Sequence, residues 1–424
     1  MSLPISQRTT LEKLSDFVLR TEPLWPVPLY FLLVYDSPYF WLGWIIVLVP
    51  WPLRLWRKGY LLPRTLFDIP ILIFVIGLVL GVIYSDHRLL SADAFQSYIC
   101  VILFYYALAD GHWIRDWKLW GAFWVLLILF IGIFILSQQA SFDTSSITSF
   151  NSWFIQILPS LPNIFDSKYI PNINSLAMIL NIAIPVLFSI SVVGTKTHPR
   201  LRICASIFTL LFVLLTAMTN SRGGWIATGI ALLVILVWRS KRALLIFPAI
   251  AGVIIWILQS GYDPLNIFQL TSESNLHRIQ IWETSIQILN NYPLLGCGLG
   301  TFPIVLASYA NLSFEVSSPH NQYIMLYADT GILGILAGVI AFTVIIITLH
   351  KLWQAPKNQT AHVIGIGILV SLVAIGIHGI FETSGAIIWQ DSISNYRYLA
   401  SILPWVAAGN LAAVMHKLKT ANNL

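Results

Sequence analysis

The sequence predicts an all-α, polytopic membrane protein: a helical bundle with roughly 11 to 12 transmembrane helices. Of its 424 residues, 57% are hydrophobic and only 10% are charged, and the mean hydropathy is +0.77. Soluble domains carry about 25% charged residues, so a chain this poor in charge belongs in a bilayer. Its apolar stretches have the length of a transmembrane helix, about twenty residues, rather than the ten or so of a barrel strand.

Apolar runs of this length follow one another along the whole chain, so residues 1–424 are predicted to form a single integral membrane domain. Membrane lipids are therefore its surroundings. A weaker, proline-interrupted stretch at 24–36 is a candidate for one further span. The predicted spans lie at residues 38–53, 69–84, 93–109, 119–138, 172–193, 203–219, 223–238, 243–259, 321–349, 361–381 and 396–415.

Lysine and arginine residues are concentrated in alternate loops. These loops hold sixteen of the 24 basic residues, the intervening loops hold five, and three precede the first predicted span. Loops rich in Lys and Arg stay in the cytoplasm. We therefore expect twelve spans, with residues 24–36 as the first and both chain ends in the cytoplasm. The net charge of +6 does not indicate nucleic-acid binding, because the basic residues lie in short loops.

Two long segments fall on the opposite, extracytoplasmic face, at about 139–171 and 260–319. In the second segment, apolar residues recur at helical spacing at Ile279, Trp282, Ile286 and Leu289. The stretch Asn290–Pro293 ends this pattern. We expect an amphipathic helix that lies across the outer mouth of the bundle.

His320 stands at the head of an apolar run of about thirty residues on the same face. The preceding residues predict a helix start, with Ser318 as the cap and Pro319 at the first helical position. A neutral imidazole on the outer face can accept a proton, as a general base must. The alternative is a polar residue that marks only a helix end. The run of residues 321–349 is ~43 Å long as a helix, longer than the membrane core, so we expect it to rise above the core or to break near Gly331.

Arg222 begins another helix on the outer face, after Asn220 or Ser221 as the cap. An arginine at the positive end of the helix dipole is unfavourable on its own, and an anion bound between Arg222 and the free backbone N–H groups would relieve it. Gly223 and Gly224 would let a bulky anion approach the backbone. The alternative is an arginine that reaches lipid phosphates.

Arg278 lies on the predicted amphipathic helix, from which it could hold the same anion. The alternative is a solvated arginine paired with Glu273 or Glu283. No metal or other cofactor is expected, because no Cys/His cluster has ligand spacing. The GCGLG segment at 296–300 follows no strand, so a tight turn is favoured over a phosphate loop.

These residues together resemble the O-antigen ligase/polymerase family of membrane glycosyltransferases. The family motif is a His, then Asn, Ser or Gln, nine residues, Gly, two residues, and Gly, Thr or Tyr. His320, Asn321, Gly331 and Gly334 fit it at every position. A second element, Arg, three residues and Leu, is matched at Arg222 with Ile226 in place of Leu. The similarity covers mainly residues 200–350.

The resemblance implies a GT-C-like, metal-independent and inverting transferase in the inner membrane. It would take a glycan from a polyprenyl (undecaprenyl) diphosphate at the periplasmic face and pass it to the hydroxyl of a lipid or glycan acceptor. His320 would be the general base, Arg222 and Arg278 would bind the diphosphate, and Asn321, Gly331 and Gly334 would support the site. Ligases, polymerases and protein-glycosylating members share these residues, so the acceptor stays open.

A transport function is the alternative from another class, because some relatives of this family are described as bicarbonate transporters. A transporter is expected to carry ionisable residues near the membrane midplane. Asp329 is the deepest such residue in the sequence, and no matching acid stands in the other half of the chain. The sequence therefore favours glycan transfer.

Overall fold

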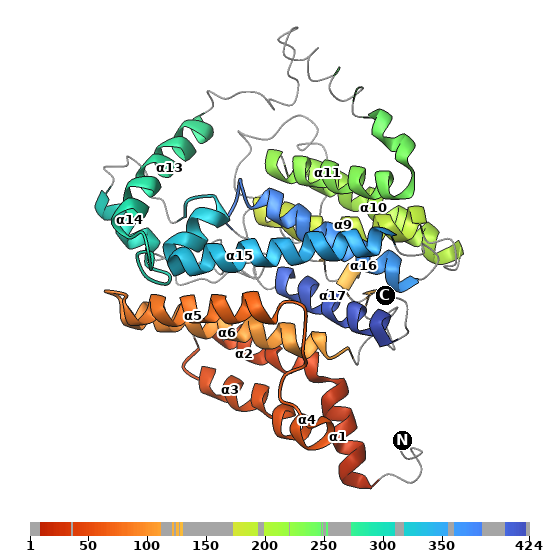
Figure 1. The fold of residues 1–424 in the computed structure, drawn as a ribbon, viewed down its shortest axis with the longest axis horizontal. Coiled ribbons are helices and arrows are strands. Elements are labelled where there is room, and N and C mark those ends of the chain that lie inside the picture. Colours follow the sequence, from red (N-terminus) through yellow and green to blue (C-terminus); the bar gives the residue numbers. More distant parts are fainter. Residues whose placement is uncertain are drawn as a thin grey trace, which may run out of the picture.

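The computed structural model describes residues 9–34, 37–111, 121–122, 124–126, 128–129, 173–193, 199–219, 221–246, 248, 252, 273–309, 318–354, 360–383 and 403–420. Within these residues every regular element is a helix, which confirms the all-α prediction (Figure 1). Six described helices are long and apolar enough to cross a membrane. They are α6 (Arg88–Ala109), α9 (Ile173–Val193), α10 (Pro199–Met218), α11 (Arg222–Arg239), α15 (Gln322–Gln354) and α16 (Thr360–His378).

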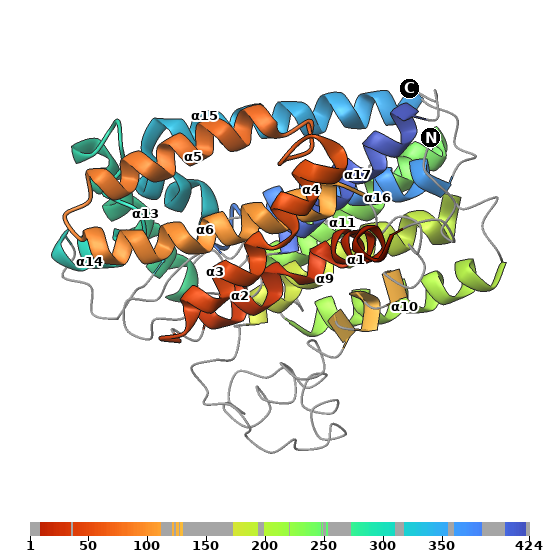
Figure 2. The same ribbon diagram turned by 90° about the horizontal axis from the view of Figure 1, so that it is seen from below.

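Two further helices complete the described part of the bundle. α5 (Asp68–Ile83) is a shorter apolar helix that packs along α15, and α17 (Leu403–Thr420) packs along α6 (Figures 1 and 2). The predicted spans at 119–138 and 243–259 lie mostly outside the described residues. A short 3-10 helix, Lys241–Leu245, follows α11.

The N-terminal part forms a hairpin of short helices. After α1 (Thr10–Arg20) and the 3-10 turn Glu22–Leu24, α2 (Pro26–Val34) packs against α3 (Phe40–Leu48), and α4 (Pro50–Lys58) follows. The span expected at 38–53 is therefore divided in two. Pro50 lies at the first position of α4, where its missing N–H costs least, and it cannot continue α3.

This hairpin brings the chain back to the level at which it started. A buried ion pair joins Arg54 of α4 to Glu22, and Arg57 contacts Glu12 of α1 at 3.0 Å. Lys58 pairs with Asp110, just after α6. The beginning of the chain therefore lies on the same side of the bundle as these three basic residues, as the loop charges predicted.

α15 breaks where the sequence predicts a break. Gly331 has φ 62° and ψ −149°, a conformation that is essentially restricted to glycine. A Cβ atom there would lie 2.0 Å from the carbonyl oxygen of Leu294, so the neighbouring loop occupies the space that a side chain would need. The sequence predicts a break near this glycine, because the apolar run of residues 321–349 would be longer as one straight helix than the membrane core.

The close approach of α5 to α15 depends on glycines that do not belong to the His320 motif. A Cβ atom at Gly81 of α5 would lie 2.6 Å from the Asp329 carbonyl oxygen, and one at Gly77 would lie 3.2 Å from the Thr330 Cβ. Gly334 instead accommodates the Thr330 side chain of its own helix, since a Cβ atom there would lie 1.8 Å from the Thr330 Oγ1. Helix α15 therefore approaches its neighbour through glycines of α5.

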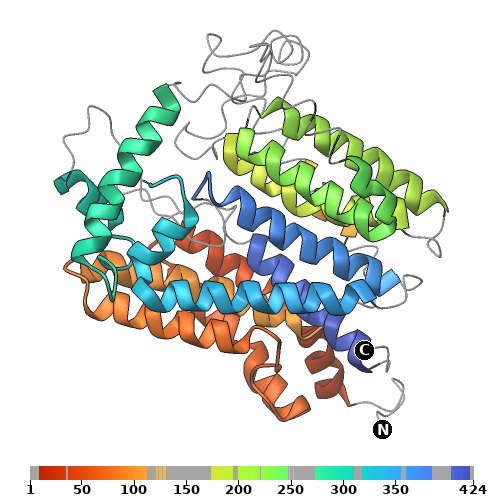
Figure 3. The same ribbon diagram turned by 45° about the horizontal axis from the view of Figure 1, so that its top comes forward.

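α13 (Glu273–Asn291) and α14 (Phe302–Tyr309) lie together at the end of the bundle opposite both chain termini (Figures 1 and 3). The helix predicted in the long loop is therefore present. Its buried face differs from the expected one, because Ile281 and Ile288 are buried, whereas Ile279 and Ile286 are half exposed. α13 packs against α14 and α15.

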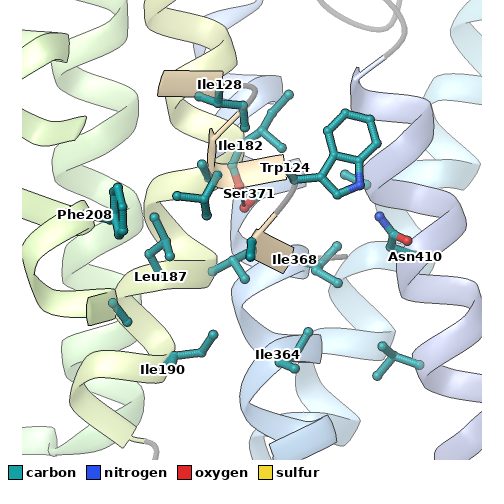
Figure 4. Close-up of a pocket in the computed structure, with 18 of the residues that line it drawn as sticks. Trp124, Ile128, Ile182, Leu187, Ile190, Phe208, Ile364, Ile368, Ser371 and Asn410 are labelled. Carbon is teal, nitrogen blue, oxygen red and sulfur yellow. Dashed lines mark hydrogen bonds between the residues drawn. The ribbon is translucent and has the colours of Figure 1, made fainter. Parts of the chain in front are cut away.

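An apolar cavity of about 340 Å³ lies among α9, α10, α16 and α17 (Figure 4). Ser371 is one of its few polar residues, and its hydroxyl donates to the Ile182 carbonyl oxygen at 2.6 Å. Asn410 is another. None of the sequence-predicted site residues lines this cavity, so the candidate site lies elsewhere.

Candidate functional site

The predicted residues come together at the end of the bundle that carries α13. Three segments meet there: the start of α11 with Arg222, residues 318–321 with His320, and the turn of residues 379–383 that follows α16. Arg278 projects from α13. Segments that are about 60 to 160 residues apart in the sequence thus form one cluster.

His320 lies just before α15 rather than inside its first turn. The helix begins at Gln322, and the Asn321 side chain caps it by accepting the N–H groups of Tyr323 at 2.9 Å and Ile324 at 3.1 Å. The prediction that Ser318 caps this helix and that Pro319 opens it is therefore wrong. An Asn accepts these N–H groups as well as a Ser does, and two sequence positions satisfied the same rule.

The backbone of His320 is held in an unusual conformation. Its φ is 46°, and His320 is the one non-glycine residue of the described chain with a positive φ. Such strain persists where neighbouring contacts impose it and is frequent at functional sites. On one side, the Trp282 indole N–H of α13 donates to the Pro319 carbonyl oxygen at 2.8 Å.

The turn after α16 holds the other side of this segment. The Gln322 N–H donates to the Gly379 carbonyl oxygen at 2.8 Å, and the Asn321 side chain donates to the Ile380 carbonyl oxygen at 3.1 Å. Asn321 therefore has two structural tasks: it caps α15 and joins it to the turn. Gly379 leaves room for the Gln322 side chain, which a Cβ atom would overlap.

Glu382 of this turn faces His320. Its Oε1 atom lies 3.4 Å from the His320 Nδ1 atom and accepts the Thr383 N–H at 2.9 Å. The Glu382 side chain is only 4% exposed, whereas that of His320 is 34% exposed. The carboxylate thus lies behind the imidazole, on the Nδ1 side of the ring.

The contacts of Glu382 oppose the effect of burial on its pKa. Burial by itself would raise its pKa, but the contact with His320, the Thr383 N–H and the nearby His378 outweigh burial and hold the pKa of Glu382 below its ordinary value. A carboxylate next to Nδ1 stabilises the histidine tautomer that carries its proton there. In that tautomer Nε2 is a proton acceptor.

Arg222 begins α11, as the sequence predicts. The Ser221 hydroxyl caps this helix by accepting the Gly224 N–H at 3.3 Å, which decides between the two predicted caps. The glycines serve packing: a Cβ atom at Gly223 would lie 2.9 Å from the Phe381 Cβ, and one at Gly224 would lie 2.7 Å from the Ala177 Cβ. The expectation that they make room for an anion is therefore wrong, since protein atoms fill that space.

Arg278 belongs to the same cluster of charges. Burial lowers its pKa, the negative charge of Glu382 opposes this, and the positive charge of Arg222 adds to the lowering. The two guanidinium groups are thus close enough to repel each other. A bound anion would reduce this repulsion. Of the expected alternative partners, Glu283 is not among the charges that act on Arg278, and the side chain of Glu273 lies outside the described part of the chain.

The GCGLG segment forms a structural turn beneath the cluster. Its Cys297 N–H donates to the Ala328 carbonyl oxygen at 2.8 Å, and its Gly300 N–H donates to Asp329 Oδ1 at 3.0 Å. These N–H groups are therefore not available to a phosphate. Asp329 also accepts the Tyr98 hydroxyl at 3.3 Å, so this buried acid joins the turn to α6.

A mainly apolar groove of about 500 Å³ begins beside the cluster. It lies among α5, α15, α16 and α17, and Gln322 and Tyr323 line the end that is nearest to His320. From there it extends along α15 as far as Ile345. Its length along the bundle is suited to a hydrocarbon chain.

Sequence reasoning missed Glu382 and His378. Both stand in the segment HGIFET, residues 378–383, at the end of a predicted span. Two ionisable residues at the end of an apolar run were the available signal, but nothing in the sequence indicated which segment they would face. Among the described residues, no group of three or more His, Cys, Asp and Glu side chains is arranged to hold a metal ion.

No protein of curated function matches the chain significantly. A family model described as O-antigen ligase matches residues 207–338, the part of the chain that holds Arg222, Arg278 and His320. The match ends before the turn that carries Glu382. It supports a glycan ligase or polymerase type of function for this multi-pass membrane protein. Residues 207–338 are thus similar to the O-antigen ligase family, as the motif around His320 predicted.

Proposed function

We propose that the protein transfers a glycan from a polyprenyl diphosphate carrier to an acceptor hydroxyl. The observation that carries this proposal is the grouping of a histidine backed by a buried carboxylate with two arginines that repel each other. A base for the incoming hydroxyl and a binding site for a departing diphosphate are the two parts that such a transfer requires.

His320 is the general base in this mechanism. Its Nε2 atom takes the proton of the acceptor hydroxyl while that oxygen forms a bond to the anomeric carbon of the donor glycan. The bond from this carbon to the diphosphate oxygen breaks, and its electron pair leaves with the diphosphate. Displacement from the opposite face inverts the configuration of the anomeric carbon.

Glu382 positions His320 and compensates its charge. Once His320 is protonated, its positive charge is 3.4 Å from a carboxylate that the surrounding contacts keep ionised. This contact is longer than a well-formed hydrogen bond, and such contacts commonly shorten when a substrate is bound. Arg222 and Arg278 stabilise the negative charge that develops on the diphosphate as it leaves.

The apolar groove supports the proposal that the donor glycan is linked to a lipid. It begins at Gln322, two residues after the proposed base, and is lined mostly by apolar side chains. The loop charges support a position of this end of the bundle on the periplasmic face of the inner membrane. Transport is not favoured, because Asp329 has hydrogen-bond partners in the fold.

The test is a glycan-transfer assay in cells that lack the protein, complemented with wild type, His320→Ala or Glu382→Gln. Loss of the base is expected to lower the rate by roughly 10²- to 10⁴-fold, with lipid-linked glycan accumulating. His350→Ala is the matched control, because His350 is an exposed histidine near the other end of α15.

Mass spectrometry of the lipid-linked glycan and of the product then identifies the acceptor. An increase in the mass of a lipid indicates a ligase, and a longer glycan indicates a polymerase. A His320→Ala protein that is inserted at wild-type level and transfers glycan at the wild-type rate would exclude His320 as the base. Unchanged glycans in cells without the protein would exclude the transfer function.

A further inference from the structure

His378 is a fully buried histidine at the junction of the two halves of the site. It is the last residue of α16, and its side chain has no exposed surface. A Cβ atom at Gly223, next to Arg222, would lie 3.2 Å from the His378 Cδ2. His378 is also only four residues before Glu382. It therefore contacts the helix that carries one proposed anion ligand and begins the turn that carries the carboxylate.

One ring nitrogen of His378 has a partner. Its Nε2 atom lies 3.4 Å from the Ser221 Oγ, and this oxygen also accepts the Gly224 N–H at 3.3 Å. Because the oxygen already accepts one hydrogen, its own hydroxyl hydrogen can be donated to Nε2. With the Ser221 hydroxyl as the donor, the imidazole proton lies on Nδ1.

The other ring nitrogen is buried and has no hydrogen-bond partner among the described residues. The second carboxylate oxygen of Glu382, Oε2, is in the same condition. Glu382 and Arg278 are the charged groups whose fields act on His378. A hydrogen-bond donor, the His378 Nδ1–H, and an acceptor, Glu382 Oε2, are thus both buried in this region. Each lowers the stability of the fold as long as it is unpaired.

We propose that His378 is a positioning residue whose Nδ1–H donates to Glu382 Oε2 when the site binds its substrates. Glu382 then joins two histidines, with Oε1 toward His320 and Oε2 toward His378. A carboxylate held at both oxygens cannot rotate away from His320, so the base keeps its tautomer and its direction. This inference rests on the proposed transfer function.

Two substitutions separate the roles of the two ring nitrogens. The amide nitrogen of His378→Asn lies near the position of Nδ1, whereas that of His378→Gln lies near the position of Nε2. The Asn variant therefore keeps the donor to Glu382 and loses the contact with Ser221, and the Gln variant does the reverse. Both remove the same ring, so each controls for loss of packing in the other.

The measurement is steady-state glycan transfer by the purified full-length protein in lipid nanodiscs, with a polyprenyl-diphosphate-linked glycan as the donor. We expect kcat of His378→Gln to fall about 10- to 100-fold, the effect of losing one hydrogen bond to a charged group. The KM for the donor should stay within about twofold, because His378 does not bind it. His378→Asn should retain most of the wild-type kcat.

Three results would overturn the inference: a wild-type kcat for His378→Gln, an equal loss in both variants, or a rise in KM alone, which would instead place His378 against the donor. If the wild-type protein transfers glycan, these results leave the proposed function intact. If the wild-type protein transfers none, the proposed function and this inference fail together.

Discussion

The substitution Gly331→Ala tests the reason for the break in α15. Gly331 has φ 62° and ψ −149°, and the Leu294 carbonyl oxygen occupies the position next to its missing side chain. Alanine cannot adopt this conformation without strain. The helix would have to straighten or the loop would have to move away, and either change disturbs the packing beneath the site.

Two contributions set the expected magnitude. Holding a non-glycine residue in this region of φ and ψ costs of order 1–3 kcal/mol. The added Cβ would lie 2.0 Å from the Leu294 oxygen, so the two backbones must separate. That movement breaks the hydrogen bond from the Ile332 N–H to the same oxygen, which is 3.0 Å long and contributes about 1 kcal/mol. The free energy of unfolding should fall by roughly 2–4 kcal/mol.

Thermal unfolding in matched nanodiscs measures this effect. The expected change in Tm is a decrease of about 2–4 °C. Gly338→Ala is the control: it lies on the same helix, its φ is not positive, and the nearest atom to an added Cβ is the Leu326 Cδ2 at 3.4 Å. Equal Tm values for the two variants would refute the argument that backbone conformation requires Gly331.

Three other predictions concern buried charges. Glu22→Gln should lower the free energy of unfolding by about 3 kcal/mol, because it leaves the buried Arg54 without its closest negative charge. Arg57→Gln, at a partly exposed ion pair, should lower it by ~1 kcal/mol or less. Thermal unfolding that ranks the two variants in the opposite order would contradict this. Asp329→Leu should lower the free energy of unfolding by about 1–3 kcal/mol, because it leaves the buried Gly300 N–H without an acceptor. Asp329→Asn should lower it less, since the amide oxygen can still accept this N–H. An Asn variant as unstable as the Leu variant would disprove this role of the oxygen. The folded state lowers the pKa of Glu382. Ionised Glu382 therefore stabilises the fold at pH values above its unfolded-state pKa, which is about 4. This stabilisation is lost as the pH falls through the lower pKa of the folded state. The Tm difference between wild type and Glu382→Gln should therefore be constant from about pH 6 to 8 and shrink below about pH 4; a difference that grows on acidification would be inconsistent with a lowered pKa.

Local sequence patterns predicted most of the described helices and three residues of the candidate site, Arg222, Arg278 and His320. The ranges predicted at 69–84 and 172–193 agree closely with α5 and α9, because an uninterrupted apolar run specifies its own helix. Two other predictions show the limit of local rules. The cap of α15 was misplaced because neighbouring residues satisfied the same capping rule, and the span at 38–53 was divided because Pro50 outweighs hydropathy.

The sequence by itself determined the membrane class, the helical fold and the family similarity of the segment that holds His320, since hydropathy and motif spacing act over short distances along the chain. Only the tertiary structure decided that Glu382 stands behind His320 and that His378 contacts the start of α11. Those contacts join segments that are far apart in the sequence, and the packing of α11, α13, α15 and α16 brings them together. A hydrophobic pattern specifies which face of a helix is buried, but the shapes of the packed side chains determine which helix covers it.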